Sequence, residues 1–89
     1  MYEFKEDIQE AISRVLQMLD DLRDNPDKIS SSANTLQKAA SLAAYLRVQA
    51  AGLVLDGNKE AGKYVSEVAM AAKEIVDMCK YRVKIDYNL

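Results

Sequence analysis

Apolar residues near the start of the chain recur at alternating intervals of four and three residues. The set comprises Phe4, Ile8, Ala11, Val15, Met18 and Leu22. This spacing gives a helix one apolar side that packs onto a hydrophobic core. Glu3, Glu6 and Asp7 add negative charge to the first turn, where the helix dipole favours it. We expect a helix over residues 3–23, ended by Pro26, whose ring disfavours a helical conformation at the residue before it.

A second set with the same spacing follows and consists of Ile29, Ala33, Leu36, Ala40, Ala43, Arg47, Ala50 and Val54. Consecutive serines at positions 30–32 lower helix propensity but make good helix caps, so we expect the continuous helix over residues 32–55. A stripe of alanines at positions 33, 40, 44 and 51 would let a neighbouring backbone approach closely. We therefore predict tight helix packing along this stripe.

A third set begins after Gly57, a residue suited to the left-handed conformation that ends many helices. It consists of Ala61, Val65, Val68, Ala72, Ile75 and Cys79, and predicts a helix over residues 58–80. Short turns place consecutive helices antiparallel to each other. The chain is therefore expected to be all-α, a single domain over residues 1–89 built as an antiparallel up-down-up three-helix bundle.

The last nine residues follow a different rule. Apolar Tyr81, Val83, Ile85, Tyr87 and Leu89 alternate with polar side chains, which is the pattern of a half-buried strand. We expect residues 81–89 to form an extended, strand-like tail. Three arrangements remain open: the helix continues and frays, the tail pairs with a second copy, or it joins a sheet edge of another protein.

Composition narrows the class of protein. A chain of 89 residues with no Trp and one Phe builds a thin core, which favours association with a second copy, most simply as a dimer. No run of apolar residues is long enough to cross a membrane and no signal-peptide pattern is present, so no membrane partner and a cytoplasmic location are expected. Residues 1–24 carry seven acids and three bases, whereas residues 80–84 carry three bases and no acid.

Catalytic and metal-binding motifs are missing from the sequence. There is no histidine and one cysteine, so triads based on histidine and the usual zinc sites are excluded. The three glycines form no phosphate-binding loop. Asp20, Asp21, Asp24 and Asp27 lack the spacing of a calcium loop. We expect no enzymatic activity, no cofactor and no metal.

Arg47 is the most informative candidate for binding, because the spacing places it in the middle of an apolar face. A guanidinium there needs an ion pair or a route to water, or it lines an oligomer interface or an anion pocket. Tyr45 and Met70 lie on the polar sides of their helices and either are isolated or belong to a contact patch. Tyr81, Arg82, Lys84 and Tyr87 are the tail residues expected to touch a partner.

These observations favour a non-catalytic protein that homo-oligomerises and acts by binding a protein partner, as accessory proteins and inhibitors do. The alternative is a binder of a small anionic ligand, such as a nucleotide, at an oligomer interface around Arg47. Nucleic-acid binding through Lys80, Arg82 and Lys84 is the weakest hypothesis, because the net charge is −2 and no further basic stripe exists.

Overall fold

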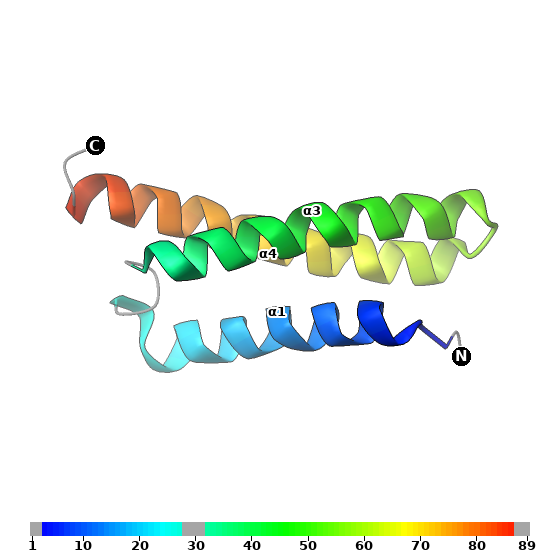
Figure 1. Ribbon diagram of the computed structural model, residues 1–89, viewed down its shortest axis with the longest axis horizontal. Coiled ribbons are helices and arrows are strands. Elements are labelled where there is room, and N and C mark those ends of the chain that lie inside the picture. Colours follow the sequence, from blue (N-terminus) through cyan, green and yellow to red (C-terminus); the bar gives the residue numbers. More distant parts are fainter. Residues whose placement is uncertain (1–2, 28–31, 87–89) are drawn as a thin grey trace.

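Three helices account for nearly all of the chain in the computed structural model, which describes residues 3–27 and 32–86, with side chains described as far as Lys80. They are α1 (Glu6–Asp24), α3 (Ala33–Leu55) and α4 (Lys59–Asp86), and these residues contain no strand. Helices α1 and α4 run in one direction and α3 runs in the other (Figure 1). The prediction of an all-helical fold is therefore confirmed for the described part of the chain, in which successive helices alternate in direction.

Local chemistry explains where α3 begins and ends. The Ser32 hydroxyl accepts a hydrogen bond from the Thr35 amide at 3.2 Å, which satisfies one of the free N–H groups of the first turn. At the other end Gly57 has a positive φ of 91°. The Asn58 amide donates to the Leu53 carbonyl at 2.8 Å and the Gly57 amide to the Val54 carbonyl at 3.0 Å. These two bonds form a Schellman motif, which turns the chain sharply into α4.

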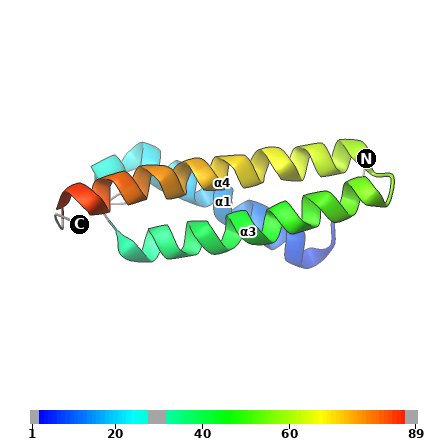
Figure 2. The same ribbon diagram turned by 90° about the horizontal axis from the view of Figure 1, so that it is seen from above.

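Helices α3 and α4 form the closest pair, and α1 lies across one face of that pair (Figures 1 and 2). Small residues explain the close approach. A Cβ placed on Gly62 of α4 would meet the Val54 Cγ2 atom at 2.6 Å and the Ala50 carbonyl oxygen at 3.0 Å. Larger side chains of α1, among them Ile8, Ile12 and Val15, fill the core on the covered face. Among residues 3–27 and 32–86, no helix covers the opposite face of the α3–α4 pair (Figure 2).

The predicted apolar faces of α1 and α4 are confirmed. In α4 all six expected residues are buried, and in α1 four are buried, with Phe4 and Met18 packed against the core at its edge. The predicted face of α3 is only partly correct: Ala43 and Ala50 are buried as expected, but Ala33, Ala40, Arg47 and Val54 are exposed. Its buried residues are Ala39, Ala43, Leu46, Ala50 and Leu53. Leu46 is fully buried, whereas Arg47 is exposed.

The alanine prediction for α3 is wrong for the same reason. Ala33, Ala40, Ala44 and Ala51 are exposed, and the alanines that pack in the core are Ala39, Ala43 and Ala50. Because α3 is apolar around most of its circumference, two rows with the same spacing were available. The row containing Leu46 and Leu53 buries more apolar area than the row containing Arg47, and it avoids placing a charge inside the core.

The strand-like tail is not observed over residues 81–86, because α4 continues to Asp86. No glycine or proline follows Lys80 to stop the helix. The cations Lys80, Arg82 and Lys84 lie in the last turns, where the negative end of the helix dipole stabilises them. Tyr87 and the rest of the expected tail lie outside the described residues. None of the helices in the described ranges has both the length and the apolar character needed to cross a membrane.

Candidate functional site

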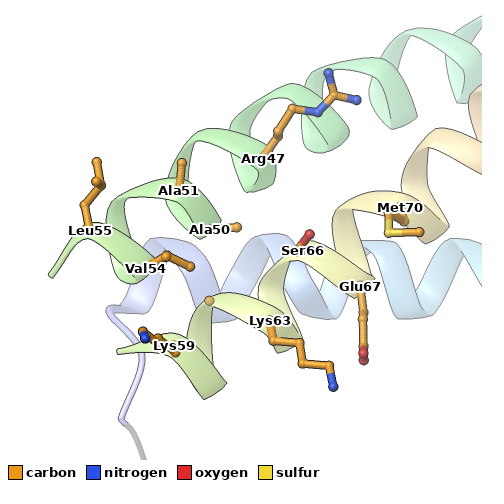
Figure 3. Close-up of a pocket in the computed structure, with 11 residues that line it drawn as sticks. Arg47, Ala50, Ala51, Val54, Leu55, Lys59, Lys63, Ser66, Glu67 and Met70 are labelled. Carbon is orange, nitrogen blue, oxygen red and sulfur yellow. The ribbon is translucent and has the colours of Figure 1, made fainter. Parts of the chain in front are cut away.

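The uncovered face of the α3–α4 pair contains an open groove of about 840 Å³. The second half of α3 forms one wall and the first turns of α4 form the other, and α1 contributes nothing to the lining (Figure 3). We call this surface the basic-rimmed groove. It is lined by Arg47, Ala50, Ala51, Val54, Leu55, Lys59, Gly62, Lys63, Ser66, Glu67 and Met70.

The floor of the basic-rimmed groove is apolar and shallow. Ala50 and Val54 lie between the two helices (Figure 3), and the absence of a side chain at Gly62 lets the α4 backbone approach both of them. The large apolar side chains beside this floor remain in water: Leu55 is 86% exposed, Met70 60% and Val54 46%. All three line one groove, and a group of large exposed apolar residues on one face is typical of a contact site.

The rim of this groove carries a surplus of positive charge. Three cations, Arg47, Lys59 and Lys63, line it together with one carboxylate, Glu67. Arg47 extends from α3 on the opposite side of the groove from Lys63 and Glu67 (Figure 3). The ion pairs of the described residues involve Arg14, Arg23 and Lys73 as their cations. The three rim cations are therefore available to acidic groups from outside the chain.

The sequence-based candidates divide between this groove and other places. Arg47 and Met70 come together in it. Tyr45 does not: it lies two residues before Arg47 on α3, which corresponds to about 200° around the helix axis. Tyr81, Arg82 and Lys84 belong to the last turns of α4, where side chains are not described. Of the two arrangements left open for Tyr45 and Met70, a shared patch in this groove is not observed, since Met70 lines the groove and Tyr45 does not.

Val54, Leu55 and Lys63 are the groove residues that reasoning from the sequence missed as a binding set. The spacing predicts a core position for Val54, because Val54 belongs to the same row as Arg47. Ala43 and Ala50 of that row are buried as predicted, whereas Arg47 and Val54 are exposed. A detectable signal was the competing row of Ala39, Ala43, Leu46, Ala50 and Leu53, which contains no charged residue.

Cys79 does not belong to the groove. Its thiol is fully buried in a cluster with Leu22, Ile75 and Val76. Burial raises the pKa of this thiol above its ordinary value of 9.0, because the apolar surroundings disfavour the thiolate. This keeps the thiol protonated and poorly reactive at neutral pH, which is the behaviour of a small core hydrophobe.

Within the described ranges, no group of three acidic or thiol side chains is arranged to hold a metal ion. The chemistry that the groove offers is apolar contact flanked by cations.

Comparison of the chain with known protein families, with curated proteins and with solved structures found no significant match.

Proposed function

We propose that this protein is non-catalytic and acts by binding another polypeptide in the basic-rimmed groove. The chemistry of the groove suits an amphipathic helix with apolar residues on one side and acidic residues along its edges. Such helices bind in grooves through side chains spaced three, four and seven residues apart. Blocking or recruiting a partner in this way is the mode of action of an accessory or inhibitor protein.

The observation that carries this proposal is the coincidence of Val54, Leu55 and Met70 on the single face of the α3–α4 pair that α1 leaves uncovered. Covering these side chains removes apolar area from water, which contributes about 25 cal/mol for each Å² buried. The rim cations add selectivity for acidic partners and speed the encounter more than they add affinity.

Affinity capture with matched variants tests this function. The full chain, Met70→Glu and the control Val48→Glu are immobilised, the retained protein is identified by mass spectrometry, and the purified partner is then titrated against each. Val48 is 67% exposed and does not line the groove. We expect unchanged affinity for Val48→Glu and at least about tenfold weaker binding for Met70→Glu, corresponding to about 1.4 kcal/mol. Equal binding by both variants would place the partner on another surface.

A second candidate function is binding of a small anionic ligand, favoured by the three rim cations of the groove. Arg47 is the natural anchor, because a guanidinium binds a phosphate through two parallel hydrogen bonds. A panel of phosphate and nucleotides is expected to raise the melting temperature of the protein, and Arg47→Ala is expected to lose that response. The absence of any shift across the panel would leave polypeptide binding as the function.

A further inference from the structure

A second apolar surface lies along the groove between α1 and α4. Near its start, Phe4, Ile12 and Tyr64 line a hollow of about 660 Å³, and the rings of Phe4 and Tyr64 lie 6.0 Å apart. Further along α1, Leu16 follows Ile12 by one helical turn and Leu19 follows Leu16 by three residues, so both continue the same side of α1. Leu16 is 47% exposed and Leu19 38%.

Helix α4 contributes a matching row to this surface. Tyr64, Ala71 and Met78 lie seven residues apart, the interval that keeps side chains on one face of a helix that packs against another. Ala71 packs at the edge of the core, while Tyr64 is 43% exposed and Met78 51%. Apart from the contact of Tyr64 with Phe4, the exposed part of this heptad row is available to a helix from another chain.

The rim of this second surface is acidic. Glu60 and Glu74 precede Tyr64 and Met78 of the apolar row by four residues each, whereas Glu67, midway between them in the sequence, lines the basic-rimmed groove. Glu60 lines the hollow beside Tyr64. None of the ion pairs among the described residues involves these three glutamates. We call this surface the acidic-rimmed face, defined by Leu16, Leu19, Glu60, Tyr64, Glu74 and Met78.

We propose that the occupant of the basic-rimmed groove is a second copy of this chain, which presents its acidic-rimmed face. Apolar side chains of the face, led by Tyr64 and Met78, cover Val54, Leu55 and Met70 of the neighbouring copy. Glu60 and Glu74 approach the rim cations Arg47, Lys59 and Lys63. Charged residues in such flanking positions set partner choice and orientation between helices.

Charge decides between this arrangement and a symmetric one. If two copies joined groove to groove, the three rim cations of one copy would lie against those of the other. If they joined face to face, the rim glutamates of the two copies would lie against each other. Like charges across an interface cost free energy, whereas groove against face pairs opposite signs. The groove is formed by α3 and α4 and the face by α1 and α4, so one copy engages two neighbours. Such head-to-tail contacts build a closed ring or an open chain of copies.

This inference rests on the proposed function, because it assigns an occupant to the same groove. It adds a consequence: another protein that uses the groove competes with self-association. Partner binding then weakens as the concentration of the chain rises.

A mixing experiment tests the inference. One variant blocks the groove (Lys63→Glu with Met70→Glu), another blocks the face (Glu60→Lys with Met78→Lys), and Val48→Lys is the control. Each substituted side chain is exposed, so far-ultraviolet circular dichroism is expected to show unchanged folding. Sedimentation velocity over a concentration series is expected to show assembly for the natural chain and the control, a single-chain mass for each blocked variant, and a dimer when the two blocked variants are mixed.

The dimer in the mixture is the decisive result, because only there does an intact groove meet an intact face. Raising the salt concentration is expected to dissociate it, since exposed charges are screened. A single-chain mass for the natural protein at every concentration overturns the inference. It does not overturn the proposed function, which the capture experiment above tests separately. Unchanged assembly of the face-blocked variant also overturns it and indicates a groove-to-groove dimer.

Discussion

Replacing Gly62 with alanine tests the closest contact in the fold. Gly62 lies in the first turn of α4 and is buried against α3. The added methyl group would sit 2.6 Å from Val54 Cγ2, 3.0 Å from the Ala50 carbonyl oxygen and 3.3 Å from the Val54 amide nitrogen. The Val54 methyl group belongs to a stiff β-branched side chain. The other two atoms are backbone, so relief requires α3 and α4 to move apart.

The expected magnitude comes from two opposing terms. Alanine stabilises a helix by about 1 kcal/mol relative to glycine. Inserting a methyl group into a fully packed contact costs about 1 to 3 kcal/mol. Gly52, in the last turns of α3, is the matched control, because a Cβ there meets nothing within 4 Å. Gly52→Ala is expected to raise the free energy of unfolding by about 1 kcal/mol. Gly62→Ala is expected to leave it unchanged or lower it by up to about 2 kcal/mol.

Urea unfolding followed by far-ultraviolet circular dichroism measures both free energies. The difference between the two variants isolates the cost of the contact, because the propensity term is nearly the same for both. Adding Val54→Ala to Gly62→Ala is expected to recover part of the loss by removing the Cγ2 atom. If Gly62→Ala stabilises the protein as much as Gly52→Ala does, α3 and α4 are not in direct contact there, and this explanation of the fold fails.

The remaining predictions use the same measurement. Leu46→Ala is expected to lower the free energy of unfolding by about 2 to 5 kcal/mol, because Leu46 is fully buried. Arg47→Ala is expected to change it by less than about 0.5 kcal/mol. A larger loss for Arg47→Ala than for Leu46→Ala would show that Arg47, as the spacing alone predicts, lies on the buried side of α3. Ser32→Ala is expected to cost about 0.5 to 2 kcal/mol, because the Thr35 amide loses its cap; a neutral effect would mean that this hydrogen bond is not formed in solution. For Cys79, burial raises the pKa of the folded thiol, so its contribution to stability is present below pH 9.0 and is lost as the pH rises from 9.0 through the raised value. The free energy of unfolding is measured for the natural chain and for Cys79→Ala on both sides of pH 9.0. It is expected to fall more steeply with rising pH in the natural chain, and an equal fall in both would contradict the burial of Cys79.

The agreement between sequence and structure differs from helix to helix for a physical reason. In α1 and α4 mostly charged and polar residues occupy the side opposite the predicted row, so the spacing identifies the buried side even though Leu16, Leu19, Tyr64 and Met78 lie outside that row. In α3 alanines and other apolar residues occupy most of the circumference, so spacing does not distinguish the row of Leu46 from the row of Arg47. In residues 81–86 the apolar and polar residues alternate as they do in a strand, but the cations there are stabilised at the end of a helix by its dipole. The structure is helical up to Asp86.

The amino-acid sequence by itself determined the three helices, their approximate ends except for the C-terminal end of α4, and the buried faces of α1 and α4, because these depend on local propensity, capping and amphipathic spacing. Only the tertiary structure decided which side of α3 faces the core and which faces water. That choice depends on how closely Gly62 lets α4 approach and on where α1 lies. The same choice turned Arg47 outward and placed it beside Met70 and Lys63, which is why the candidate groove could not be assembled from spacing alone.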